Sequence, residues 1–468
     1  MEIKASVKEI VELIYGSGDL ISETYLLKRA EEGTRIHQEH QSHYKEGDQS
    51  EVYVDYEEST PEYTLFISGR IDGLIRRNRK LIIEEIKSTT KDLEQLDENT
   101  SPAHLAQAKM YAYIYILKQE KKSIDVRLTY IQVKTGKSKK MDFHCTKAEL
   151  EFFFRDTIDQ YIRWLQIIDE HEEFRNRSIE GLNFPFAQYR DGQRDLMGAC
   201  YKTILNRDIL YAIAPTGVGK TIATIYSSLK AINQKNQKIF YLTAKNLGKQ
   251  VALKTMELLM ANNLVAKTIE ITAKDQICLQ EVRDCDPEKC PYSKGYFNKI
   301  FPAIKDLHQH EEIFNKETIV RYALKHQVCP FELSLDASYY ADIIICDYNY
   351  AFCPRTHIIR YFDEESKYRP ILLVDEAHNL VPRSKDMYSG SISKIKILTL
   401  AKLLKENGCH LQQDFSAVLN HMKNYEDELE QVEYLVSALD EEFVGLILNL
   451  FMKADAWVTE AKAVNDKN

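Results

Sequence analysis

The residues best placed to do chemistry lie in residues 214–221, which read APTGVGKT. This stretch follows a short apolar run, Ile209 to Tyr211, that we expect to be a buried strand. It precedes Ile222 to Lys230, where apolar residues recur at helical spacing. A glycine loop between strand and helix binds phosphate, because backbone N–H groups and the helix N-terminus point at the anion. Ala214 stands where this motif has its first glycine, and an ordinary glycine turn is the alternative.

The loop residues have separate expected roles in binding a nucleotide. The ammonium of Lys220 would reach the β- and γ-phosphates, and the hydroxyl of Thr221 would hold Mg²⁺. The sequence thus predicts an ATP site formed by Thr216, Gly217, Gly219, Lys220 and Thr221.

An acidic motif strengthens this prediction. The apolar strand expected at 371–374 is followed by Asp375, Glu376, Ala377 and His378. Nucleotide hydrolases place a Mg²⁺ ligand and a water-activating carboxylate at such a strand end. We assign Asp375 to the metal and Glu376 to the catalytic water, and we expect His378 to couple the nucleotide site to its neighbours.

A second group of reactive side chains lies on an expected hairpin near the N-terminus. Asp72 belongs to the strand expected at 63–74, and Glu85 and Lys87 come at and just beyond the strand expected at 81–86. Glu85 and Lys87 are two residues apart, so they point to the same face, which Asp72 can also reach. Two carboxylates and a lysine on one face suit a divalent metal with a lysine that orients water or stabilises phosphate charge. A surface ion-pair hairpin is the alternative.

Nine cysteines are present, and four of them are spaced as a ligand set in the middle of the chain: Cys278, Cys285, Cys290 and Cys329. Four thiolates can hold zinc or an iron–sulfur cluster. The set contains no C-x-x-C pair, which tells against a zinc ribbon. The other five are interpreted as core thiols: Cys145, Cys200, Cys346, Cys353 and Cys409.

These groups must be positioned by an α/β framework. Apolar periodicity predicts helices at 7–15, from 32 onward, at 149–168 and, as a strongly amphipathic segment, at 426–446. It predicts further strands at 126–132, 140–145, 238–243 and 342–346. The basic turns at 76–80 and 134–140 are either phosphate contacts or solvated hairpin tips.

The composition is that of an ordinary globular protein, with 468 residues, enough for about three domains. No run of 18 apolar residues and no basic-then-apolar leader is present, so we expect a cytoplasmic protein without membrane association. The net charge is −9. Any contact with DNA is therefore expected to depend on local basic patches.

Four motifs resemble the RecB-like branch of the PD-(D/E)XK nucleases. They are G-x-x-x-H at 33–37, G-R-I-D-G at 69–73, E-I-K at 85–87 and Q-x-x-x-Y at 107–111. The resemblance implies that His37, Asp72 and Glu85 bind Mg²⁺ or Mn²⁺ and that Lys87 is catalytic. It also implies that Gln107 and Tyr111 lie on a helix facing the substrate. His40 and His43 are expected to be solvated.

The rest of the chain resembles the XPD/DinG group of iron–sulfur helicases. Residues 189–193 resemble the adenine-reading stretch of superfamily 2 helicases, with Gln193 as the reader. The phrases beginning Cys290-Pro291 and Cys329-Pro330 resemble bacterial members of the group. The resemblance implies a [4Fe–4S] cluster on the four spaced cysteines, with zinc as the alternative.

The expected architecture is a PD-(D/E)XK nuclease domain followed by a RecA-like parallel-sheet ATPase lobe. An iron–sulfur domain would be inserted in that lobe, and part of a helical arch domain would follow it. The expected domains are the nuclease at 1–180, the motor at 181–275 and 336–385, the cluster insertion at 276–335 and the arch at 386–468. No Q-x-x-G-R-x-x-R stretch follows, so a protein partner or further chain would supply the second motor lobe.

Two functions remain open from the sequence. The first is an ATP-dependent DNA helicase and nuclease acting 5′ to 3′ on single-stranded or forked DNA, in repair or defence. The second is a non-catalytic DNA-binding or assembly subunit whose nuclease and ATP sites are idle. The absence of a second motor lobe favours the second function, and the intact set of Asp72, Glu85 and Lys87 favours the first.

Overall fold

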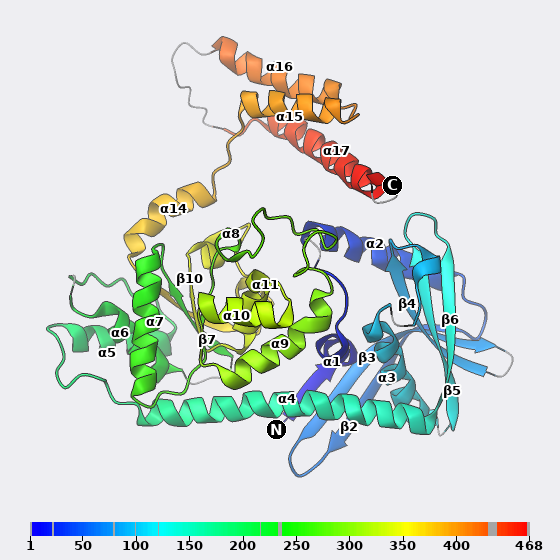
Figure 1. Ribbon diagram of the computed structural model, residues 1–468, viewed down its shortest axis with the longest axis horizontal. Coiled ribbons are helices and arrows are strands. Elements are labelled where there is room, and N and C mark those ends of the chain that lie inside the picture. Colours follow the sequence, from blue (N-terminus) through cyan, green and yellow to red (C-terminus); the bar gives the residue numbers. More distant parts are fainter. Residues whose placement is uncertain are drawn as a thin grey trace. The chain divides into compact units, whose positions relative to one another are not determined.

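The computed structural model describes residues 2–20, 23–77, 80–98, 100–119, 121–215, 217–232, 236–428 and 438–465. It divides into two compact units, Met1–Val381 and Pro382–Asn468 (Figure 1). The first unit contains two separate sheets, and the second is helical. The described residues include no helix long and apolar enough to cross a membrane.

The first sheet has six strands in the order β1-β3-β4-β5-β6, with β2 also paired to β3. The expected strands near the N-terminus are all present in it. The strands are β1 (Glu2–Ser6), β2 (Gln49–Ser59), β3 (Thr64–Arg77), β4 (Lys80–Thr89), β5 (Ser123–Gln132) and β6 (Ser138–Thr146).

An opening in this sheet lies at the middle of β3. One edge of β3 pairs with β2 along its length. The other edge pairs with β1 over residues 64–68 and with β4 over residues 73–77. Beyond Glu84, β4 continues beside β5 as far as Thr89. Residues 69–72 therefore lie between two partners, where β3 and β4 separate.

Helices cover this sheet and form its core. Helices α1 (Val7–Tyr15) and α3 (Pro102–Gln119) pack together with the start of α4 (Lys147–Gly181) over a large apolar cluster. Helix α2 (Glu23–Ser42) contacts β4. The expected helix from residue 32 is therefore the second half of a longer one.

Helix α4 is longer than expected. A capping box of Thr146 and Glu149 begins it, and it continues to Gly181 rather than ending near Ile168. Its 35 residues span about 52 Å at 1.5 Å per residue. The charged stretch after Ile168 stays helical because Arg175 is buried and pairs with Asp342 of the second sheet.

The second sheet has five parallel strands in the order β11-β7-β10-β8-β9. The strands are β7 (Gln237–Leu242), β8 (Thr268–Glu270), β9 (Ile313–Phe314), β10 (Ile343–Cys346) and β11 (Arg369–Val374). Helices α5 (Gln193–Asn206), α6 (Lys220–Ala231) and α7 (Asn246–Ala261) belong to this lobe (Figure 1). An all-parallel sheet with such helices is consistent with a RecA-like ATPase lobe.

The expected strand at Ile209 to Tyr211 is wrong. These residues form no strand, and the side chains of Ile209 and Tyr211 are 81% and 89% exposed. Helix α5 ends at Arg207 in the left-handed conformation, with φ 60°. Strand formation needs a paired neighbour, and three apolar residues do not specify one.

The cysteine region is mainly helical. It contains α8 (Lys274–Ile277), α9 (Tyr296–His310), α10 (Lys316–His326) and α11 (Pro330–Ala337). Pro330 occupies the first turn of α11, where a missing N–H is tolerated, directly after Cys329. The short helices that follow are α12 (Asn349–Phe352), α13 (Ile359–Phe362) and α14 (Leu380–Met387).

The second unit has its own small core. Helices α15 (Lys394–Glu406), α16 (Gln412–Glu428) and α17 (Glu441–Asn465) bury Leu404, Phe415, Val418 and Leu450. The expected helix at 426–446 is not continuous. Residues 429–437 lie outside the described residues, and residues 438–440 precede α17 without being helical. The Asp440 carboxylate accepts from the N–H of Phe443 in the first turn of α17.

Candidate functional site

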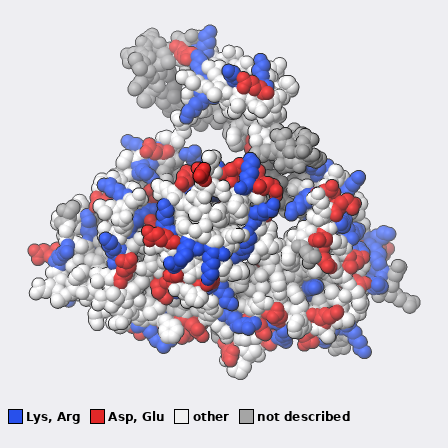
Figure 2. Space-filling view, in the orientation of Figure 1, with Lys and Arg blue, Asp and Glu red and all other residues white. Residues whose placement is uncertain are grey.

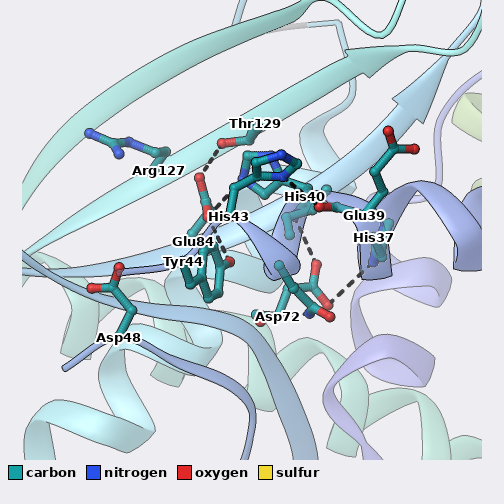
Figure 3. A network of polar contacts seen from close by, with 12 residues as sticks. His37, Glu39, His40, His43, Tyr44, Asp48, Asp72, Glu84, Arg127 and Thr129 are labelled. Carbon is teal, nitrogen blue, oxygen red and sulfur yellow. Dashed lines mark hydrogen bonds and ion pairs between the residues drawn. The ribbon is translucent and has the colours of Figure 1, made fainter. Parts of the chain in front are cut away.

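The opening between β3 and β4 brings three of the predicted nuclease residues together. Asp72 ends the free part of β3, and its Oδ2 accepts a hydrogen bond from the N–H of Ile86 at 2.8 Å. Its Oδ1 lies 3.8 Å from Nδ1 of His37 on α2 (Figure 3). The carboxylate thus bridges the two separating strands and faces the helix that carries the G-x-x-x-H motif.

Glu85 and Lys87 lie beyond the last β3–β4 pair. Glu85 is 1% exposed, and Lys87 Nζ lies 2.7 Å from Glu85 Oε1. Lys87 is thus the charged partner of Glu85 Oε1, while Oε2 is buried and receives no hydrogen bond from the described residues. A buried carboxylate that keeps one oxygen without a donor is costly, and a further cation would offset that cost.

Burial also sets the protonation of these groups. Burial raises the pKa of Glu85 to about 7, although the charge of Lys87 opposes the change. Burial likewise raises the pKa of Asp72 and lowers the pKa of His37. For Lys87 burial acts to lower the pKa, but the neighbouring carboxylates outweigh it and raise the pKa.

The residues present fit a divalent metal in their chemistry. Carboxylate oxygens and an imidazole nitrogen are ligands of Mg²⁺ and Mn²⁺, and Glu85 Oε2 is buried without a hydrogen bond from the described residues. Among the described residues, however, no three His, Cys, Asp or Glu side chains converge as a ready metal site. Binding would therefore require His37, Asp72 and Glu85 to turn toward a common point.

Gln107 and Tyr111 line the inner side of this site. Gln107 Oε1 accepts a hydrogen bond from Lys87 Nζ at 3.2 Å, and Gln107 Nε2 donates to the Tyr111 hydroxyl at 3.4 Å. Both side chains are buried, so they support Lys87 from behind rather than facing solvent. The Tyr111 ring needs Gly69, because a Cβ there would lie 2.6 Å from the ring.

A buried polar network beside the site was missed by sequence reasoning. Glu84 is completely buried and accepts hydrogen bonds from Thr129 and Tyr44, with His40 Nε2 3.3 Å away (Figure 3). The expectation that His40 is solvated is therefore wrong, whereas His43 is exposed. His37, His40 and Gln41 share one face of α2, which could have indicated polar contacts on that face, but the donors Thr129 and Tyr44 come from other segments that local spacing does not identify.

In the basic turn at 76–80, one of the positive charges is paired with an acidic residue. Arg77 pairs with Asp48, with Nη2 2.5 Å from Oδ2, and this pair lowers the pKa of Asp48 to about 2. Residues 78 and 79 of the same turn lie outside the described residues. Lys and Arg side chains are interspersed with Asp and Glu over the face seen in Figure 2. Positive charge is thus distributed in small groups.

The predicted nucleotide residues meet at the end of the second sheet. Lys220 at the start of α6 lies 3.2 Å from Oε1 of Glu376, which follows β11. Hydrogen bonding and the charge of Lys220 lower the pKa of Glu376. Lys220 also donates to the carbonyl of Ala214 at 3.4 Å. The loop lysine and the expected water-activating carboxylate are therefore neighbours.

The phosphate loop has the backbone that its glycines predict. Gly217 and Gly219 have φ angles of 93° and 79°, which side-chain-bearing residues rarely adopt. Gln193 is buried and donates from Nε2 to the carbonyl of Gly219 at 3.3 Å. Thr216 lies outside the described residues.

The metal-side residues of this site are also close to one another. Asp375 follows β11, and the hydroxyl of Thr243 donates to its Oδ2 at 3.5 Å. Thr221 Oγ1 lies 3.2 Å from the hydroxyl of Tyr241 on β7. His378 is exposed, with Nδ1 3.5 Å from Oε2 of Glu376. Thr221 at the start of α6 and Asp375 directly after β11 would both be available to a bound Mg²⁺.

The four spaced cysteines line one small pocket. Cys278, Cys285, Cys290 and Cys329 surround it together with Leu20, which comes from the nuclease part of the chain. Burial raises the pKa of the Cys329 thiol to about 11. The donor set suits a thiolate-bound group, although the described side chains do not converge as a ready metal site. All five remaining cysteines are buried.

Two protein families match successive parts of this chain. Residues 3–201 match the PD-(D/E)XK nuclease superfamily model, and residues 220–397 match the DEAD_2 model. The ATP-dependent DNA helicase XPD of Sulfolobus acidocaldarius is 23% identical over 234 residues, covering 50% of this chain and 40% of that protein. The Fanconi anemia group J protein homolog of Gallus gallus is 24% identical over 126 residues, which cover 26% of this chain and 10% of that protein.

Two solved structures are also similar. A structure named XPD helicase is 18% identical in sequence; the match covers 59% of this chain and 48% of that structure's chain, with a TM-score of 0.38. A structure named truncated XPD is also 18% identical; the match covers 57% of this chain and 76% of that structure's chain, with a TM-score of 0.36. The chain spans less than half the length of the two curated relatives above.

Fold and site together define a mixed-sheet nuclease-like domain joined to a parallel-sheet ATPase lobe. The chain combines an N-terminal PD-(D/E)XK nuclease domain with an XPD-like DEAD_2 helicase region. Its distant relatives are helicases of the XPD kind.

Proposed function

We propose that this chain is a metal-dependent DNA nuclease joined to an ATP-driven DNA motor. The observation that carries the proposal is the Glu85–Lys87 pair, buried beside Asp72 where the first sheet opens. A lysine, together with a divalent metal held by the two carboxylates, would suit the cutting of phosphodiesters, because the leaving oxygen and the phosphate both develop negative charge. Both family matches support DNA as the substrate.

In this proposal His37, Asp72 and Glu85 hold Mg²⁺ or Mn²⁺. The bound metal would polarise the phosphate and lower the pKa of a bound water. The ammonium of Lys87 donates to the attacked phosphate or orients the water, and it is kept charged by the carboxylates around it. Gln107 accepts from Lys87 and so limits the directions in which the ammonium can point.

The motor part would bind ATP with Mg²⁺ on the loop at Gly217 to Thr221. Lys220 would exchange its Glu376 partner for phosphate oxygens, which would free Glu376 to activate water. Gln193, which reaches the loop from α5, would read the base. We propose 5′-to-3′ movement on single-stranded or forked DNA, in repair or defence.

We further propose that Cys278, Cys285, Cys290 and Cys329 hold a [4Fe–4S] cluster, with zinc as the alternative. Their shared pocket supports this, since the stretch between α8 and α9 contributes three cysteines to it and the start of α11 contributes the fourth. We also propose that ATP turnover needs a second motor lobe, from a partner or from further chain. An arginine supplied to the γ-phosphate accelerates comparable hydrolases by about 10³–10⁵.

The decisive experiment is DNA cleavage by the chain with labelled single-stranded DNA and Mn²⁺ or Mg²⁺, with and without ATP. We expect Lys87→Ala to cut at least about 10²–10³-fold more slowly, because the variant loses a charge at the developing oxyanion. Lys91→Ala, which removes an exposed lysine four residues away, is the matched control and should cut normally. Lys220→Ala should remove any effect of ATP.

Equal cutting by the wild-type chain and Lys87→Ala would show that the nuclease assignment is wrong. Binding of DNA without cutting by the wild-type chain would support the second function, a non-catalytic DNA-binding or assembly subunit. Circular dichroism of each variant shows whether the fold is retained.

A further inference from the structure

The described side chains of helix α2, at residues 33–42, contact the first sheet mainly through polar groups. His37, His40 and Gln41 recur at the spacing that places residues on one face, and Tyr44 follows just beyond the end of the helix. Gln41 Nε2 donates to the Asp72 carbonyl at 2.9 Å and to Glu51 Oε1 at 3.0 Å. Among these side chains only Ile36 is buried. The position of this part of the helix therefore depends on directional contacts.

Glu84 is the centre of these contacts. It is completely buried, and Thr129 on β5 donates to its Oε1 at 2.5 Å. The Tyr44 hydroxyl donates to its Oε2 at 2.8 Å, and His40 Nε2 lies 3.3 Å from the same oxygen (Figure 3). A buried carboxylate is stable only with such donors, so it holds all three elements at fixed distances.

Glu84 and Glu85 are consecutive residues of β4, so their side chains point to opposite faces of the strand. Glu85 points to the ion pair with Lys87, and Glu84 points to α2. His37 and His40 lie three residues apart, about 4.5 Å along the helix. A rotation of α2 that separates His40 from Glu84 would therefore also move His37 away from Asp72.

We propose that Glu84 is a positioning residue of the nuclease site, which fixes α2 on β4 and so holds His37 against Asp72. The proposal rests on the proposed nuclease function. Glu84 is not itself a metal ligand or a catalytic group, because it is inaccessible and both oxygens already face donors. It acts through the helix that carries the ligand.

The test compares Glu84→Gln and Tyr44→Phe with Glu39→Gln in the full chain. Glu39→Gln makes the same chemical change on the exposed face of α2. Three quantities are measured: amide hydrogen exchange of residues 33–42 without metal, Mn²⁺ affinity by calorimetry, and kcat and KM for DNA cleavage. Circular dichroism checks that each variant is folded.

We expect Glu84→Gln to exchange faster over residues 33–42 and to bind Mn²⁺ about 10–100-fold more weakly, as for loss of groups that orient ligands. The kcat should fall while KM for DNA stays unchanged. Tyr44→Phe removes one donor without changing the ring, so its effects should go in the same direction and be smaller. Glu39→Gln should match the wild-type chain.

Unchanged exchange and unchanged Mn²⁺ affinity in folded Glu84→Gln would overturn the positioning role. If Glu84→Gln does not fold, Tyr44→Phe decides by the same two measurements. If the wild-type chain binds Mn²⁺ but does not cut DNA, the nuclease function fails. The exchange and affinity data then still support or overturn the effect of Glu84 on α2 and His37.

Discussion

At the scale of single residues, the proposed nuclease site contains a carboxylate that folding has removed from water with one charged partner. Glu85 has Lys87 as its close partner, and the pKa of Glu85 is raised to about 7 by burial. A divalent cation would relieve this condition directly. In the metal-free protein the Glu85 carboxylate, whose charge a metal ion would neutralise, is therefore partly protonated at neutral pH.

This protonation predicts a pH-dependent metal affinity. Because metal binds the ionised carboxylate, Mn²⁺ binding should release close to one proton per chain near pH 6 and progressively fewer above pH 7. Affinity should therefore fall as the pH drops below about 7. Calorimetry of Mn²⁺ binding in buffers of different ionisation enthalpy measures the proton number.

Glu85→Gln is the control, since it should lose this proton together with most of the affinity. A proton number that stays constant from pH 5.5 to 8.5 would contradict the prediction.

The raised pKa of Glu85 has a second consequence, for the stability of the fold. It stabilises the metal-free fold below the ordinary carboxyl pKa, and that contribution is lost as the pH rises through 7.

The sequence indicated the residues of the site better than their surroundings. Asp72, Glu85 and Lys87 could be grouped because strand periodicity says which side chains share a face. The burial of Glu84 could not be read in this way, because its donors Thr129 and Tyr44 come from other elements. The spacing of residues within one segment does not show which residues from distant segments will pair with them.

At the scale of elements, α4 joins the two sheets of the first unit. Its start packs in the nuclease core through residues such as Phe154 and Ile158. Its later part reaches the second sheet, where Arg175 Nη1 lies 2.6 Å from Asp342 Oδ1 and His171 Nε2 lies 2.9 Å from Asp342 Oδ2. Despite burial, these partners lower the pKa of Asp342 well below its usual range.

We expect Arg175→Ala to destabilise the first unit by about 3–5 kcal/mol, because it leaves the buried Asp342 with fewer partners. Arg177→Ala removes an exposed arginine paired with Glu173 and should change stability by less than about 1 kcal/mol. Urea unfolding followed by fluorescence measures both. Similar unfolding midpoints for the two variants would show that the buried pair contributes little.

The misjudged elements have related causes. The end expected for α4 near Ile168 followed from its charged sequence, whereas buried pairing with Asp342 continues the helix. The strand expected at 209–211 followed from apolar residues, whereas those side chains are exposed. In both cases tertiary contacts decide the outcome, and local composition does not contain them.

At the scale of the whole molecule, the cysteine pocket adjoins both parts of the first unit. Leu20 lines the pocket, and its N–H donates to the carbonyl of Ser293. The neighbouring Asp19 accepts from the N–H of Gly295 at 2.7 Å. A cluster held there would therefore stand beside a segment that leads from α1 to α2.

Protein purified without oxygen should contain about four irons per chain if the pocket holds a [4Fe–4S] cluster. Cys290→Ser should lose most of that iron, because it removes a proposed ligand. Cys409→Ser changes a buried thiol of the second unit and should keep the iron. Metal analysis by mass spectrometry distinguishes the outcomes, and one zinc per chain instead would refute the cluster.

The continuity of α4 has a consequence for how this protein can vary. Its nuclease contacts extend to Ile162, with Leu165 at the margin of the same cluster, and its motor contacts begin at Trp164, whose ring meets Tyr340 and His308. One residue inserted near Arg163 would turn everything beyond it by about 100° and shift it about 1.5 Å. Seven inserted residues make nearly two complete turns and add about 10.5 Å. Such a shift would break the direct contacts of Leu20 with Ser293 and of Asp19 with Gly295, so we expect the length of α4 between its two sets of contacts to be fixed.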